Sequence, residues 1–64
     1  MTMGERIKAM RKAQGLTQEE LGNMLGIKKA AVQKYEKGTV KNIKYDTLML
    51  LAEIFGTSVE YIVS

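Results

Sequence analysis

The stretch Thr17–Gly38, TQEELGNMLGIKKAAVQKYEKG, predicts two short helices joined by one tight glycine turn. Thr17 is a typical N-cap residue, and Glu20 follows three positions later, so the pair can form a capping box at the start of the first helix. Three apolar residues then repeat at helical spacing along this helix: Leu21, Met24 and Leu25. Gly26 ends the helix, because glycine readily adopts the left-handed backbone that a helix C-terminus often needs.

The second helix of this stretch begins after Ile27 and ends at Gly38. Its apolar stripe consists of Ala31, Val32 and Tyr35. Because only a glycine turn separates the two helices, they must cross steeply, as in a helix-turn-helix. Gly22 lies in the middle of the first helix, where glycine costs about 1 kcal/mol relative to alanine. We expect a close helix crossing at that position.

At these residues the chain resembles the phage repressor and Cro (XRE-type) family of helix-turn-helix proteins. The matching residues are Gln18, Leu21, Gly22, Leu25, Gly26, Ile27, Val32, Tyr35 and the ending Glu36-Lys37-Gly38. The resemblance extends from Glu5-Arg6-Ile7 to Ser58-Val59-Glu60-Tyr61. It implies an all-α, lambda-repressor-like domain of five short helices. Lys28 departs from the family, which usually caps the next helix with Ser or Thr, and Ile43 departs where many members have Pro.

The remaining elements are predicted from periodicity and from glycine positions. The first helix runs from Met3 to Lys12 or Gln14, and its inward methionines indicate core packing rather than an adaptable binding surface. A helix over Tyr45–Phe55 directs four side chains to the core: Leu48, Leu51, Ala52 and Phe55. Ser58 caps a last turn over Val59–Val63, in which Tyr61 and Ile62 are expected to pack inward.

Length and composition exclude several classes of protein. The 64 residues allow one small domain, residues 1–64, and the absence of Cys and His excludes disulfides, the usual zinc sites and a Ser-His-Asp triad. The longest apolar run, Leu48–Ala52, is far shorter than the roughly 20 residues of a membrane span. Glu19 and Glu20 are adjacent on a helix and do not face each other, so they are not a catalytic pair. We therefore expect no enzyme activity, cofactor, metal or small-molecule substrate.

Charge is unevenly distributed along the chain. Residues 28–44 contain six lysines and one glutamate, a local charge of +5, whereas residues 45–64 contain three acidic residues and no basic ones. This distribution suggests one face built for a polyanion. The alternative is an ordinary lysine-rich surface.

If Ile27, Val32 and Tyr35 are buried, the second helix of the opening stretch turns five residues outward: Lys28, Lys29, Ala30, Gln33 and Lys34. In a DNA major groove, Lys29 and Lys34 can donate to guanine, Gln33 can bind adenine, and Ala30 can contact a thymine methyl group. The resemblance implies base reading for Lys29, Ala30 and Lys34, and defines it less well for Lys28 and Gln33. Solvated lysines or phosphate contacts are the alternative.

A second group of residues is predicted to hold the DNA backbone: Gln18, Lys37, Lys41, Asn42 and Lys44. Gln18 opens a helix whose free N–H groups and dipole favour a phosphate. The resemblance implies that Lys41, Asn42 and Lys44 belong to a loop that follows the sugar-phosphate backbone. It also implies an ion pair between Arg11 and Glu36, for which two separate surface charges are the alternative.

These observations predict sequence-specific binding of double-stranded DNA by a cytoplasmic, nucleoid-associated repressor of bacterial or phage origin. The resemblance implies a homodimer on an inverted repeat, in contact through Met49, Leu50 and Ile54 or through the C-terminal end. Repressors of this type often continue into a second domain, so the chain can also be the N-terminal part of a longer one. The alternative function is an antitoxin-like protein-interaction module that uses the fourth helix and the C-terminal turn.

Overall fold

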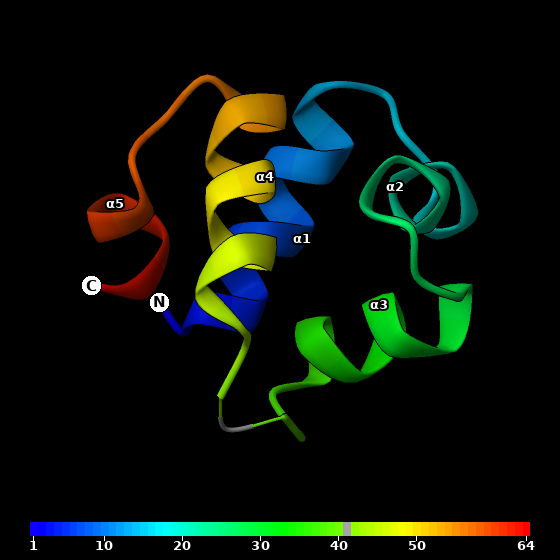
Figure 1. Ribbon diagram of the computed structural model, residues 1–64, viewed down its shortest axis with the longest axis horizontal. Coiled ribbons are helices and arrows are strands. Elements are labelled where there is room, and N and C mark those ends of the chain that lie inside the picture. Colours follow the sequence, from blue (N-terminus) through cyan, green and yellow to red (C-terminus); the bar gives the residue numbers. More distant parts are fainter. Residues whose placement is uncertain (41) are drawn as a thin grey trace.

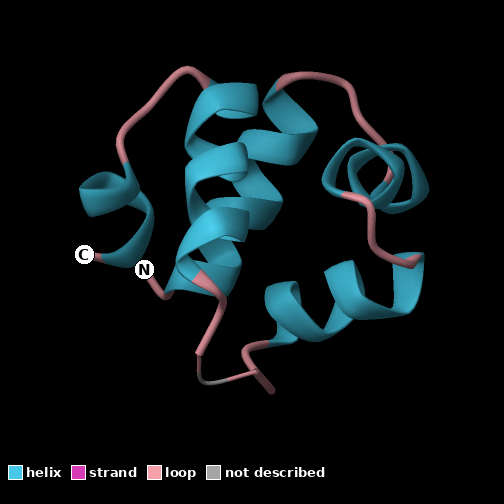
Figure 2. Cartoon of the chain, in the orientation of Figure 1, coloured by secondary structure: helices cyan, strands magenta, loops and turns pink. Residues whose placement is uncertain are grey.

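The computed structural model describes residues 1–40 and 42–64, and these residues form a bundle of short helices without strands (Figures 1 and 2). The helices are α1 (Met3–Ala13), α2 (Gln18–Leu25), α3 (Lys29–Lys37), α4 (Tyr45–Phe55) and α5 (Val59–Val63). The predicted all-α fold of five helices is confirmed, and the predicted bounds of α4 and α5 are those observed. The first helix ends at Ala13, between the two predicted ends.

Local sequence explains where the helices begin. Thr2 and Glu5 form a capping box at α1, and Thr17 and Glu20 form one at α2, in which the Thr17 hydroxyl accepts from the Glu20 N–H at 3.0 Å. Such a cap satisfies N–H groups that have no partner within the helix. By contrast, Lys28 and Lys44 precede α3 and α4 without a side-chain cap. The two uncapped helices are the ones with basic N-caps.

The core lies where the helices meet, and α3 packs against both α1 and α2, while α5 packs against α1 and α4. Its fully buried large side chains are Ile7, Leu21, Val32, Leu51 and Ile62. Both termini lie beside α5, on the opposite side of the molecule from α2 (Figure 1). In the described ranges, no helix is both long and apolar enough to cross a membrane.

Two sequence expectations about apolar residues were wrong. Met24 was expected in the stripe of α2 but is 51% exposed, because Leu21 and Leu25 already fill the inward face of that short helix. Tyr61 was expected to pack inward but is 52% exposed; Ile62 takes the buried position, and the Tyr61 ring lies 5.6 Å from the Arg6 guanidinium. Ile54 packs against the core, whereas Met49 and Leu50 are exposed.

Candidate nucleic-acid interface

The turn between α2 and α3 sets the angle between these helices. Gly26 has a left-handed backbone (φ 72°), and the N–H of Ile27 donates to the Gly22 carbonyl at 2.9 Å. A Cβ atom on Gly22 would lie 2.8 Å from the Ile27 carbonyl oxygen, closer than real contacts allow. The glycine in the middle of α2 is therefore required by a close approach, as expected. The backbone that Gly22 approaches is the segment that leads into α3.

The orientation of α3 follows from its buried residues. Val32 is fully buried, and Tyr35 packs partly against the core. Because these residues face inward, the opposite side of the helix faces solvent. Four of the five candidate base-reading residues are exposed on this side: Lys28, Lys29, Ala30 and Lys34. The fifth, Gln33, is half-buried.

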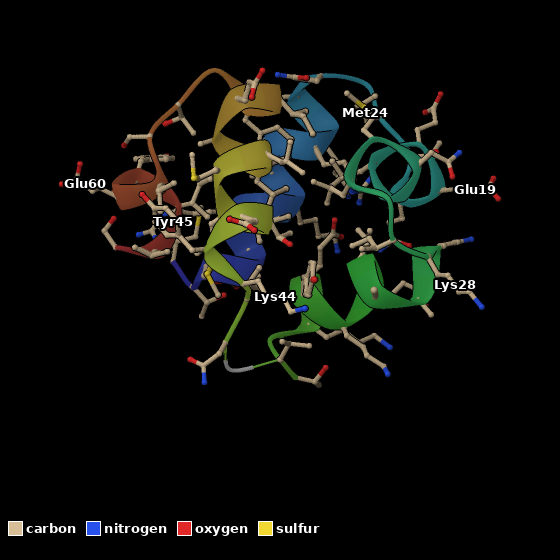
Figure 3. The ribbon with its side chains drawn as sticks, in the orientation of Figure 1. Glu19, Met24, Lys28, Lys44, Tyr45 and Glu60 are labelled. Atoms are coloured by element: carbon tan, nitrogen blue, oxygen red, sulfur yellow. The ribbon has the colours of Figure 1, made fainter. Side chains whose placement is uncertain are left out.

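The solvent-facing side of α3 carries positive charge alone. The helix contains one acidic residue, Glu36, and its side chain is only 4% exposed. Lys28, Lys34 and Lys37 are exposed, and Figure 3 shows Lys28 pointing away from the body of the molecule where α3 begins. Lys44 is exposed as well, at the N-cap of α4 (Figure 3). With Lys29, which is also exposed, α3 and its N-cap thus present four lysines and no acid to solvent.

Glu36 is turned inward by a bidentate ion pair with Arg11. The Arg11 Nε donates to Glu36 Oε2 at 2.6 Å, and Nη2 donates to Oε1 at 3.1 Å. The Arg11 Nη1 donates to the Leu16 carbonyl at 2.8 Å. The hydrogen bonds to Glu36 raise the pKa of Arg11 above its ordinary value, while burial opposes them. The resemblance implied this pair, and in the structure it joins α1 to the end of α3.

Gln18 donates a hydrogen bond to this ion pair, a contact that the sequence did not predict. Its half-buried side chain donates from Nε2 to Glu36 Oε1 at 3.1 Å, so one amide hydrogen is already used inside the protein. Beside it is an open pocket lined by Arg11, Gly15, Leu16, Thr17, Gln18, Glu19 and Lys29. This pocket brings the start of α2 next to Lys29 at the start of α3.

The loop before α4 is anchored by its apolar residue. Ile43 is buried, at the position where many members of the resembled family have proline. Its neighbours Asn42 and Lys44 are both exposed. Lys41 was predicted to belong to the same group and lies outside the described residues. Within the described part, Asn42, Lys44 and Lys37 are thus available to a ligand.

Gly4 supports the site and was missed by sequence reasoning. A Cβ atom there would lie 2.5 Å from the Tyr35 carbonyl oxygen and 2.6 Å from that of Glu36. The first turn of α1 thus touches the backbone at the end of α3. Glycine inside a helix was the available signal, since the same reasoning identified Gly22.

Comparison with known sequences places this geometry in a family. A sequence model described as Helix-turn-helix matches residues 7–62. The chain is also similar to the uncharacterized HTH-type transcriptional regulator YobD of Bacillus subtilis, with 38% identity over 58 residues. That match covers 91% of this chain and 51% of YobD, so the chain spans about half the length of this relative.

Solved structures of two regulators have the same arrangement of helices. The P22 c2 repressor in complex with a synthetic operator superposes with a TM-score of 0.92 at 30% identity, covering 100% of this chain and 96% of that one. SinR, a master regulator for biofilm formation solved in complex with DNA, gives a TM-score of 0.85 at 26% identity, covering 95% and 97%; SinR is from Bacillus subtilis. With residues 7–62 matched and this structural agreement, the chain belongs to the helix-turn-helix family, of the phage repressor and Cro (XRE) type.

Proposed function

We propose that this protein binds double-stranded DNA sequence-specifically and represses transcription, with α3 in the major groove. One observation carries the proposal: the charged side chains on the solvent-facing side of α3 are all lysines, because its single acid, Glu36, is held inward by Arg11. A carboxylate on that face would repel the phosphates that flank the groove. The relatives support the same conclusion, since P22 c2 and SinR were both solved bound to DNA.

The exposed side chains of α3 suit base edges. An α-helix fits the major groove, where each base pair presents a distinct pattern of donors and acceptors. Lys29 and Lys34 are assigned to guanine O6 and N7, and Ala30 to a thymine methyl group. Gln33, which is half-buried, is assigned to adenine, and Lys28 lies at the N-cap of the helix.

Backbone contacts are assigned to both sides of α3. The N-terminus of α2 at Gln18 offers free N–H groups to one phosphate. Lys37 ends α3, and Asn42 and Lys44 follow it in the chain; all three are exposed and are assigned to phosphates. Lys41 belongs to this proposed set by its position in the sequence. Such contacts fix the register of the protein on DNA and carry no sequence information directly.

A homodimer on an inverted repeat completes the proposal. The described residues measure 25 × 24 × 21 Å, less than the roughly 34–36 Å between half-sites one helical turn apart. Large apolar side chains are exposed on α4 and α5: Tyr45, Met49, Leu50, Tyr61 and Val63. Pairing at this end leaves both copies of α3 free for DNA.

The same exposed apolar side chains favour a second candidate, a protein-interaction module that neutralises a different partner through α4 and α5. The two candidates differ in what they expect of α3. A protein-interaction module has no need of a positively charged face on that helix, whereas DNA binding uses one. With DNA binding we also propose a location in the cytoplasm, with the nucleoid, for a protein of bacterial or phage origin.

A selection from a pool of random duplexes tests the proposal. Wild-type protein should enrich one sequence with two-fold symmetry, and footprinting on it should show two protected half-sites about one helical turn apart. Enrichment of a single asymmetric half-site would contradict the dimer. If no sequence is enriched at all, specific DNA binding is the wrong function, and the protein-interaction module becomes the better candidate.

A further inference from the structure

One carboxylate connects three helices at the candidate interface. Glu36 in the last turn of α3 accepts two hydrogen bonds from Arg11 of α1 and one from Gln18 Nε2 of α2, the last at 3.1 Å. The orientation of the Gln18 amide follows from chemistry, because an ionised carboxylate only accepts and must therefore face the NH₂ group. The Gln18 Nε2 group thus donates one hydrogen bond within the protein, and this bond to Glu36 orients the side-chain amide.

The Gln18–Glu36 hydrogen bond lies far from the turn that joins α2 to α3, so it can restrict the angle between the two helices. The turn at Gly26 joins the end of α2 to the start of α3, whereas Gln18 and Glu36 lie at the two far ends of these helices. A helix of eight residues is about 12 Å long. A bond across the far ends therefore resists a change in the angle that the turn alone would permit.

We propose that Gln18 is a positioning residue that holds α3 at a fixed angle to α2 through Glu36, and that it thereby sharpens sequence discrimination. This inference rests on the proposed function. It differs from assigning the Gln18 side chain to a phosphate, since a phosphate donor strengthens binding to every duplex equally. A positioning residue acts on the base edges that α3 reads, and leaves binding to random DNA unchanged.

The experiment replaces Gln18 with Met, which keeps the length of the side chain and its helix propensity but cannot donate a hydrogen bond. The probes are the duplex recovered by selection with wild-type protein and a scrambled duplex of the same composition. The ratio of the two affinities should fall about tenfold, the equivalent of one hydrogen bond to a charged group. Affinity for the scrambled duplex should stay at the wild-type value.

Gln14→Ala is the matched control. Gln14 also donates from Nε2, to the Ile54 carbonyl at 2.8 Å, but that bond joins α1 to α4 and does not involve α3. The control should keep the wild-type affinity ratio. Equal losses on both duplexes for Gln18→Met would show a direct phosphate contact and overturn the inference, as would no change on either duplex.

A measurement without DNA separates this inference from the proposed function. In the free protein, NMR should show slow exchange of the Gln18 side-chain amide protons, and Gln18→Met should shift backbone amide signals along α3 more than Gln14→Ala does. Fast exchange and an unchanged α3 would overturn the positioning role. If wild-type protein prefers no duplex but these NMR results are obtained, the proposed function fails and the link between α2 and α3 stands.

Discussion

Arg11 and Glu36 form a bidentate ion pair in which the two side chains are only 9% and 4% exposed. Residues 25 positions apart in sequence thus connect α1 to the last turn of α3. The pair stabilises the fold and also removes the single acid of α3 from the face that we assign to DNA. The same contact therefore has a structural consequence and a functional one.

The first prediction is that Glu36→Gln destabilises the protein strongly, because it leaves the buried Arg11 guanidinium without its counter-charge. Removing one partner of a buried pair costs about 3–5 kcal/mol, and each kcal/mol lowers the melting temperature of so small a domain by roughly 4–8 °C. Thermal unfolding followed by circular dichroism measures this change. Glu53→Gln, at an exposed position of α4, is the control and should melt like wild type. A Glu36→Gln variant that also melts like wild type would show that the pair contributes nothing.

The second prediction concerns Gly4→Ala, for which two effects have opposite signs. Helix propensity alone would make the alanine variant more stable by up to about 1 kcal/mol. The added Cβ atom would however lie 2.5 Å from the Tyr35 carbonyl oxygen, a backbone atom that cannot rotate away. We expect a loss of about 1–3 kcal/mol in the free energy of unfolding, as for overpacked core positions. Chemical denaturation decides the sign, and a stabilised variant would refute the close approach.

The third prediction is a loss of stability at low pH that depends on Glu5. The Thr2 backbone N–H donates to Glu5 Oε1 at 2.8 Å, and this bond, helped by the Thr2 hydroxyl, lowers the pKa of Glu5. The pKa of Glu5 is lower in the folded protein than in the unfolded chain. Ionised Glu5 therefore stabilises the folded protein above the ordinary pKa of 4.5, and this stabilisation is lost as the pH falls through the pKa that Glu5 has in the folded protein. Glu5→Gln should therefore reduce the fall in melting temperature below that pH. An unchanged pH profile would argue against the capping box in solution.

The fourth prediction separates base reading from phosphate binding. Lys29→Ala and Lys34→Ala should each cost about 1–3 kcal/mol on the selected duplex and much less on random DNA. Lys44→Ala should weaken all duplexes about equally and reduce the slope of log affinity against log salt by around one unit. Titrations of each variant at several salt concentrations measure both effects. Uniform losses for all three variants would remove Lys29 and Lys34 from the base-reading set.

The helices were predictable because their signals are local. Thr17, Gly26 and Gly38 mark helix ends in the sequence, and the stripe of Leu21 and Leu25 specifies which face of α2 is buried. The resemblance added the Arg11–Glu36 pair, which no local rule predicts. The exposed face of α3 followed from the expected burial of Ile27, Val32 and Tyr35, of which Val32 is fully buried and the other two partly.

Features that depend on the meeting of distant segments were not predictable. The Gln18–Glu36 hydrogen bond depends on the angle between α2 and α3, which periodicity does not specify. The exposure of Tyr61 depends on which residue of α5 faces the core. That residue is Ile62, which is fully buried. A five-residue helix has too few positions to define an apolar stripe.

The central claim is sequence-specific binding to duplex DNA through α3, and the affinity ratio of wild-type protein tests it most directly. Titrations should use the duplex recovered by selection and a scrambled duplex of the same composition, at physiological salt. We predict that the selected duplex binds at least about 10³-fold more tightly, the lower range for specific protein–DNA complexes. Equal affinities for the two duplexes would contradict the claim, because any basic protein binds DNA without regard to sequence.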